Sequence, residues 1–255
     1  MRPGARQKQE KRPGAKSFCA SGSSGPQRAR SRNIKMCFAQ QIRRRTRMEL
    51  DQAILSRHVV RSFSSRPVER ELIEAILEAG RQAPFAGLAQ AGRSDFRRFF
   101  VIELGTEQAE AVTELCNDFN RCFAQRVQEE NLVEKYPAYC SIFTGPHGAP
   151  RMKTNFGCQW LVIAAERKGM PKREQYVLGY VMAQMWLKAT ELGLGFCPRS
   201  TVIDILKKDE LCEILGLPDT EWQFDAFTVG WPAENVQPRT APRPTPVADI
   251  TWFTK

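Results

Sequence analysis

The segment 175–192 restricts the fold more than any other part of this chain. Its apolar residues occupy nearly every side of a helix and leave only a narrow polar strip, formed by Gln184, Lys188 and Glu191. A helix of this kind must be covered on all sides. The segment therefore predicts a central helix, and a second subunit is one way to supply part of its cover. The apolar residues are Val177, Leu178, Tyr180, Val181, Met182, Met185, Trp186, Leu187 and Ala189.

The remaining elements mix helices and strands without a regular β-α-β alternation, which favours an α+β layer fold. Runs rich in branched and aromatic residues predict strands over 98–103 and 224–231, and 196–203 is expected to be extended. The apolar run 157–165 fits either a buried helix or a strand, because periodicity does not separate the two. Apolar spacing predicts helices over 49–57, 68–82, 106–135 and 204–215.

Two loops are also expected. Residues 83–87 end the second helix, since proline and glycine follow it directly. The stretch 137–150 is punctuated by Pro and Gly and predicts a long loop, and such loops often cover a site. Asp204 is expected to cap the helix that follows it.

The basic residues are concentrated at the N-terminus. Residues 1–47 hold 14 Lys plus Arg and one acid, Glu10, whereas the rest of the chain has a formal charge of −3. The tail has few large apolar side chains, so we expect disorder over 1–47. Four interpretations of the tail remain open: an organelle transit peptide, a nucleic-acid arm, a membrane-surface anchor, and an inert or untranslated segment. Met36 and Met48 are alternative starts.

Composition limits the other classes. No stretch approaches the roughly 20 consecutive apolar residues of a membrane-spanning helix. No apolar signal-peptide core is present, so a cytoplasmic protein is expected. The eight cysteines form no Cys-x-x-Cys pair and lie apart from His58 and His147, which predicts reduced thiols and no metal site. Nucleic-acid binding would depend on the tail alone.

Several common enzyme motifs are missing. The sequence contains no Walker A motif, no Gly-x-Ser-x-Gly and no His-Glu-x-x-His. Gly193 and Gly195 lack the third glycine of the dinucleotide fingerprint and follow a helix instead of a strand. With two histidines, a Ser-His-Asp hydrolase has no support.

Five short patterns carry the chemical information instead. Each is weak alone, but five in a fixed order are hard to produce by accident. In this order and at these distances they resemble the FMN-dependent nitroreductase superfamily, from about Met48 to the C-terminus. The patterns lie at 56–63, 79–90, 189–198, 229–234 and 242–244.

The resemblance implies an FMN site. The family's basic positions match Arg57, Arg61 and Arg243, and a phosphate needs such fixed cations. His58 either contacts the same part of FMN or is an ordinary polar residue near a helix end. The resemblance also aligns 84–88 with the segment beside the isoalloxazine ring, and 198–201 with the segment whose backbone N–H groups point at flavin N5. The implied cofactor-binding residues are Arg57, His58, Val59, Arg61, Pro84, Phe85, Ala86, Leu88, Pro198, Arg199, Ser200, Thr201 and Arg243.

The sequence departs from the family pattern at three points. Val59 stands where the family usually has Ser, and Leu88 stands where it usually has Asn. Neither side chain can make the polar contact to flavin that the usual residue makes. Gln90 is followed by Ala91 and Gly92 instead of an aromatic residue. The cofactor is therefore more firmly implied than the reaction, because superfamily members also dehalogenate, dehydrogenate or fragment flavin.

The sequence thus predicts a three-layer α+β nitroreductase-like domain over 48–255, with a central, mostly antiparallel sheet flanked by helices. The resemblance implies an intertwined homodimer with FMN at its interface. NAD(P)H would deliver a hydride to flavin N5, and a small electron-poor acceptor would then take the electrons. The cofactor does the chemistry, so we expect no catalytic side chain. Two alternatives remain: a flavoenzyme on the same fold that does not use NAD(P)H, and a degenerate flavin-free binding protein.

Overall fold

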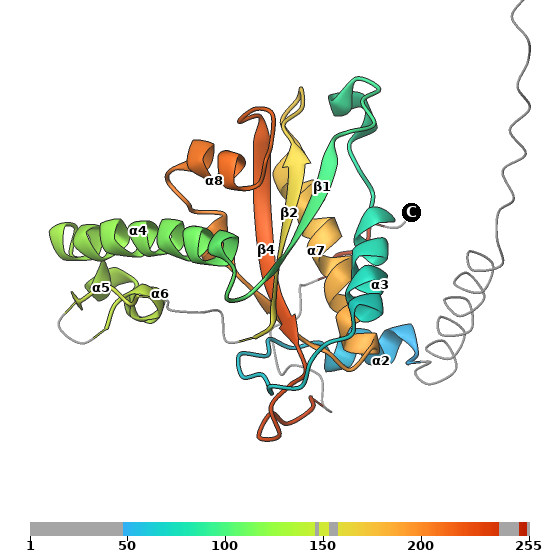
Figure 1. Ribbon diagram of the computed structural model, residues 1–255, viewed down its shortest axis with the longest axis horizontal. Coiled ribbons are helices and arrows are strands. Elements are labelled where there is room, and N and C mark those ends of the chain that lie inside the picture. Colours follow the sequence, from blue (N-terminus) through green and yellow to red (C-terminus); the bar gives the residue numbers. More distant parts are fainter. Residues whose placement is uncertain (1–47, 146–147, 153–157, 240–249, 254–255) are drawn as a thin grey trace, which may run out of the picture. The chain divides into compact units, whose positions relative to one another are not determined.

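The middle layer of the described chain is a four-stranded antiparallel sheet (Figure 1). The computed structural model describes residues 48–145, 148–152, 158–239 and 250–253, so the basic tail and Arg243 lie outside the described residues. The strands follow the order β1-β2-β4-β3 across the sheet. They are β1 (Arg97–Glu103), β2 (Trp160–Arg167), β3 (Gly195–Pro198) and β4 (Trp222–Gly230).

Strand β2 resolves the ambiguous apolar run. It pairs with β1 on one side and with β4 on the other, and residues 161–166 are all buried. A strand in this position is covered on both faces, so its sequence is continuously apolar instead of alternating. The helix alternative for 157–165 is therefore wrong.

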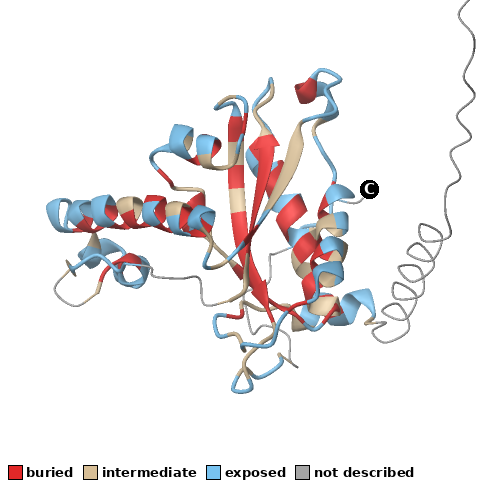
Figure 2. Cartoon of the chain, viewed as in Figure 1, coloured by how far each residue is buried: buried red, intermediate tan, exposed pale blue. Residues whose placement is uncertain are grey.

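Helices cover both faces of the sheet. One face packs on α3 (Arg70–Arg81) and α7 (Glu174–Glu191), which also pack on each other. The other face packs on α4 (Glu107–Glu129) and α8 (Lys208–Ile214), and this side holds the main apolar core around Leu161. Figure 2 shows burial concentrated in the sheet and on the helix sides that face it. The predicted three-layer α+β fold is confirmed.

The close packing of α3 on α7 depends on Gly80. A Cβ at this position would lie 2.8 Å from the Met185 sulfur and 3.0 Å from the Phe99 ring. Such distances are too short for ordinary contacts, so any side chain here would displace Met185, and glycine lets the two helices approach without that shift.

The N-terminal part of the described chain crosses to the far edge of the sheet. Helix α2 (Leu50–Ser56) packs on α7, and the chain then runs extended. Val59 forms a parallel bridge with Phe196 of β3, and the Val60 N–H donates to the Phe196 carbonyl at 3.1 Å. The first basic pattern therefore lies beside β3, about 140 residues away along the chain.

Two predictions in the middle of the chain are wrong in part. The predicted helix 106–135 ends at Glu129, because Asn131 adopts a left-handed conformation with φ 49°. A short helix, α5 (Leu132–Lys135), follows. Half of the expected loop 137–150 is the helix α6 (Pro137–Phe143), in which Pro137 occupies the first turn, where a proline is tolerated.

The region after β3 also differs from the prediction. The extended stretch ends at Pro198 instead of residue 203, and a 3-10 turn, η3 (Ser200–Val202), comes next. Helix α8 begins at Lys208, so Asp204 does not cap it. The Asp204 N–H instead donates to the Ser200 carbonyl at 3.3 Å.

Candidate functional site

An extended segment after α2 carries the first group of predicted site residues. In an extended chain, alternate side chains point to opposite sides, so Arg57, Val59 and Arg61 share one side and His58 takes the other. The Arg57 guanidinium carbon lies 4.3 Å from the centre of the Trp186 ring, a cation–π contact with α7. The Trp186 indole N–H donates to the His58 carbonyl at 3.3 Å, which ties the segment to the same helix.

A cavity of about 430 Å³ lies beside Arg57; we call it the α2–α7 cavity. It brings together Arg57 and Pro198, two residues that the sequence assigned to one site. Its wall is mostly apolar, and Asp225 of β4 is its one acidic residue among those described. The lining residues are Ile54, Arg57, Gly179, Met182, Ala183, Trp186, Leu187, Pro198 and Asp225.

Asp225 is an acid that the sequence analysis missed. Burial raises its pKa from 3.8 to about 6, and one hydrogen bond, from the Ala226 N–H at 2.7 Å, opposes that shift. No salt bridge joins it to a cation among the described residues. A negative charge here would repel a phosphate, so a ligand in the cavity presents a neutral or donor-bearing part to Asp225.

His58 does not face the α2–α7 cavity. Its ring contributes to a second cavity of about 230 Å³, which also includes Val60, Leu194 and Arg239. The ring Nδ1 lies 2.9 Å from the Ser56 carbonyl oxygen, and Nε2 is buried without a hydrogen-bond partner among the described residues. The structure thus places Arg57 and His58 in separate cavities.

The segment 198–201 turns away from the sheet at the rim of the α2–α7 cavity. The Arg199 N–H already donates to the Ala226 carbonyl at 2.7 Å, and its side-chain Nε donates to Thr228 Oγ1 at 3.1 Å. Ser200 is exposed and Thr201 is buried, and the two begin the 3-10 turn. Because the first N–H groups of a turn have no acceptor within it, Ser200 is better placed than Arg199 to offer its amide to a ligand.

The second group of predicted residues lies elsewhere. The loop of Pro84, Phe85, Ala86 and Leu88 follows the C-terminal end of α3, whereas α2 lies near the opposite end of α3 (Figure 1). A helix of 12 residues spans about 18 Å. Phe85 stacks on Phe96 with ring centres 4.5 Å apart, and Leu88 is 98% exposed. One chain therefore does not bring the two groups together.

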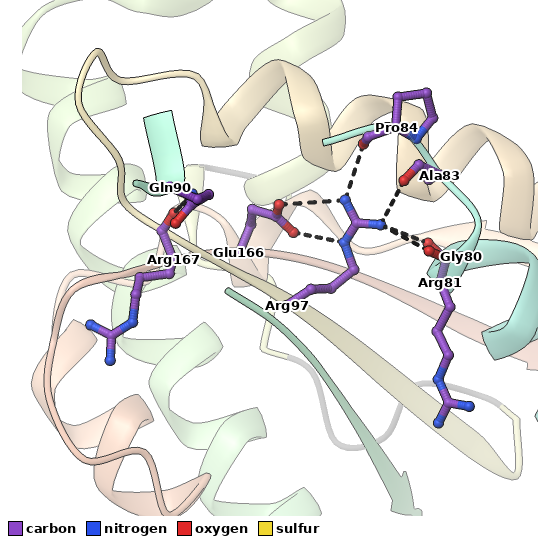
Figure 3. A network of polar contacts seen from close by, with 8 residues as sticks. All are labelled: Gly80, Arg81, Ala83, Pro84, Gln90, Arg97, Glu166 and Arg167. Carbon is purple, nitrogen blue, oxygen red and sulfur yellow. Dashed lines mark hydrogen bonds and ion pairs between the residues drawn. The ribbon is translucent and has the colours of Figure 1, made fainter. Parts of the chain in front are cut away.

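A network of polar contacts holds this loop (Figure 3). The Arg97 guanidinium donates to Glu166 Oε2 at 2.8 Å and to the carbonyls of Gly80, Ala83 and Pro84 at 3.0, 2.9 and 3.1 Å. The sequence analysis missed this ion pair, whose members are 69 residues apart. One signal was present: Glu166 is an acid that directly continues an otherwise apolar run.

Neither a metal site nor a membrane-spanning helix is formed by the described residues. Among the described residues, no three His, Cys, Asp or Glu side chains come close enough together to hold a metal ion. The cysteines in this part of the chain form no disulfide, and Cys116, Cys140, Cys197 and Cys212 are buried. No helix in the described ranges combines the length and apolarity needed to cross a membrane.

Comparison with known proteins identifies the family. The model of the nitroreductase family matches residues 54–231, so this chain belongs to the nitroreductase family. No curated protein matches the chain.

Solved structures with the same fold are distant in sequence. A BluB-like flavoprotein from Clostridium difficile 630 is 20% identical, with a TM-score of 0.60, and the match covers 82% of this chain and all of the other. The FMN- and NADPH-dependent nitroreductase NfnB from Sphigopyxis sp. strain HMH is 20% identical, with a TM-score of 0.53 and 81% and 100% coverage. An iodotyrosine deiodinase bound to FMN and 3-iodo-L-tyrosine is 19% identical, with a TM-score of 0.56 and 80% and 100% coverage.

Proposed function

We propose that this chain is an FMN-dependent oxidoreductase of the nitroreductase type, which passes electrons from NAD(P)H to a small electron-poor acceptor. One observation carries the proposal: Arg57 and Pro198, taken from separate motifs, line the same cavity. Bound FMN would supply the centre that accepts and donates the hydride. Several neighbouring structures are described as FMN complexes, and NfnB is described as NADPH-dependent.

The residues of the cavity fit different parts of FMN. Arg57 lines the cavity, whereas Arg61 is exposed and follows on the same side of the extended segment without lining it. Both can hold a phosphate by charge and hydrogen bonds. The apolar wall formed by Met182, Trp186 and Leu187 suits an aromatic ring and excludes water. Asp225 would repel the phosphate from its part of the wall, because like charges repel. Together these residues bind and orient the cofactor.

We further propose an intertwined homodimer, since two features of a single chain are incomplete. The first is α7: Tyr176 and Tyr180 are 51% and 48% exposed, so its outer face lacks the cover that its sequence predicts. Leu50 and Ile54 of the adjoining α2 are also exposed. The second is the distance of the loop 84–88 from Arg57 within one chain. A second copy would cover the apolar face and bring its own loop to the site.

The homodimer is tested by measuring the mass in solution. Light scattering should give twice the chain mass for the wild type and the single-chain mass for Ile54→Glu, which places a charge on the exposed apolar face. Leu206→Glu is the matched control, because Leu206 is also exposed but lies outside this face. A monomeric wild type, or an Ile54→Glu variant that remains dimeric, would contradict the proposal.

A second candidate is a flavoenzyme that does not use NAD(P)H. It is favoured by Leu88, an apolar residue at 98% exposure where the family pattern has a polar one. One neighbouring structure is a deiodinase, so dehalogenation is a reaction carried by this fold.

A cytoplasmic location is part of the main proposal, because NAD(P)H is supplied there.

The visible absorption spectrum of the purified full chain, followed by anaerobic addition of NADPH or NADH, separates these candidates. A flavin spectrum that bleaches supports the reductase, and one that does not bleach supports the second candidate. A chain that stays colourless after FMN is added would refute both.

Variants of two matched arginines test the site. Arg57→Gln should weaken FMN binding about ten- to a hundredfold, the effect of losing a charged hydrogen bond. Arg66→Gln is the control, because Arg66 also stacks on a tryptophan, 3.7 Å from the Trp231 ring centre, but does not line the cavity. Equal FMN binding by both variants would remove Arg57 from the site.

A further inference from the structure

The loop 84–88 is fixed at its two ends by buried side chains and is exposed in its middle. The contacts at the two ends come from β1, β2 and the segment after β2. In the middle, Phe85 and Leu88 are 51% and 98% exposed. The loop therefore has a fixed base and an apolar tip that projects from the chain.

Arg97 holds the first end. Its side chain is 8% exposed, and its donors reach Glu166 and four backbone carbonyls, those of Gly80, Arg81, Ala83 and Pro84 (Figure 3). Gly80 belongs to the last turn of α3, and its carbonyl accepts both the Ala83 N–H at 3.2 Å and the guanidinium at 3.0 Å, so Arg97 ties the helix end to the start of the loop. Glu166, at 1% exposure, sets the orientation of the planar guanidinium.

Gln90 and the segment after β2 hold the second end. The buried Gln90 side chain donates from Nε2 to the Arg167 carbonyl at 2.8 Å (Figure 3). The Met170 N–H donates to the Ala89 carbonyl at 3.1 Å. The backbone of Gly169 lies so close that an added Cβ would be 2.7 Å from the same carbonyl oxygen. The loop thus packs tightly against the end of β2.

We propose that Arg97, Glu166 and Gln90, together called the loop clamp, are positioning residues that hold Phe85 and Leu88 ready to complete the cofactor site of a second copy. This inference rests on the proposed function for the identity of that cofactor, FMN. A preformed loop avoids the ordering cost of binding, which is the usual gain from preorganisation.

Stability alone does not account for the clamp. A buried ion pair is often no better for stability than a well-packed apolar pair, because removing two charges from water is costly. The donors of Arg97 reach four carbonyls at the base of the loop, and an apolar pair could not bind them. The contacts are therefore directed at the geometry of the loop.

The test compares two paired variants of the full chain. Arg97→Gln with Glu166→Gln removes both charges of the clamp and leaves no buried charge unpaired. Arg167→Gln with Asp219→Asn is the control, because the side chains of this 2.8 Å ion pair start from the next residue of the same strand and make no hydrogen bond with the loop in the described part of the chain, while the Arg167 carbonyl that accepts from Gln90 is backbone and is kept. Three quantities are measured for both variants. They are the dissociation constant of FMN, the thermal unfolding temperature, and the amide hydrogen exchange rates at Gly87, Gln90 and Ala91.

The clamp variant should exchange these loop amides at least about tenfold faster and bind FMN about tenfold more weakly than the control. Arg97→Lys should fall between the clamp variant and the wild type, since lysine restores the charge but not the planar fork of donors. Unchanged loop exchange in the clamp variant would overturn the inference, and so would an equal loss of FMN binding in the control.

The two proposals can fail separately. If the wild-type chain binds no FMN, the proposed function fails, and the exchange rates still decide whether the clamp fixes the loop. If FMN binds normally to a clamp variant whose loop exchanges rapidly, the positioning role fails and the proposed function stands.

Discussion

Glu166 and Asp225 are two buried or partly buried acids on the same face of the sheet, and their surroundings differ. Glu166 on β2 pairs in register with Gln223, two residues from Asp225 on β4. Glu166 has an arginine at 2.8 Å, whereas Asp225, within the described part of the chain, accepts only from the N–H of its neighbour Ala226. Burial raises the pKa of both carboxyls, and Arg97 opposes the shift at Glu166.

The comparison separates a structural acid from a candidate functional one. An acid with a good cationic partner can remain ionised and fix the position of other groups, as Glu166 does for Arg97. An acid without such a partner, on the wall of a ligand cavity, changes its charge near neutral pH and is a candidate for a functional role. Asp225 meets both conditions, because it lines the α2–α7 cavity and has a pKa of about 6.

The largest expected effect comes from breaking the Glu166 pair. Arg97→Leu should lower the free energy of unfolding by about 3–5 kcal/mol, because it leaves a buried carboxylate without its partner. The double variant Arg97→Leu with Glu166→Leu should lose much less than the sum of the two single variants. Urea unfolding measures all three. Additive losses would show that the two residues do not act as a pair.

Asp225 should have a smaller effect on the free energy of unfolding, and this effect should depend on pH. Between pH 3.8 and about 6 the folded chain keeps the Asp225 proton that the unfolded chain releases, so wild-type stability falls as the pH rises through this window. Over this whole window the free energy of unfolding falls by about 3 kcal/mol. Asp225→Asn should therefore gain stability relative to the wild type between pH 4 and 7, as measured by urea unfolding.

Asp219 provides the opposite control. The Arg167 guanidinium beside it lowers the pKa of this carboxyl, so its contribution to stability is lost as the pH falls below its ordinary value of 3.8. Asp219→Asn should then lose stability relative to the wild type as the pH rises. A difference between Asp225→Asn and the wild type that does not change with pH would contradict the assignment to Asp225.

The smallest expected effect concerns a second acid near the pair. The buried Glu174 on α7 raises the pKa of Glu166 further, after the larger effect of burial. Glu174→Gln removes this charge and keeps an acceptor for the Arg173 N–H, so the pKa of Glu166 should fall and stability should rise by less than about 1 kcal/mol. Carbon NMR of the Glu166 carboxyl measures the first change. An unchanged pKa would mean that the two acids do not interact.

The sequence predicted more of the fold than of the site. The periodicity of the long helices and the motif order were sufficient for the layer architecture and the family. The expected loop over 137–150 was wrong in part, because Pro137 begins a helix. Proline is compatible both with a loop and with the first turn of a helix. The motifs led to Arg57 and Pro198, but Arg97 and Asp225 are single charged residues in or at strands and belong to no recognised pattern.

The sequence by itself determined which segments are apolar, how they repeat, and therefore that a helix such as α7 needs cover on nearly every side. It also determined the family, because short motifs survive in order along the chain. Only the tertiary structure decided which charges meet. Arg97 meets Glu166 across 69 residues, and Asp225 enters a cavity formed by α2, α7, β3 and β4. The physical reason is that partner and burial set the role of a charged side chain, and both depend on strand register and packing between distant segments.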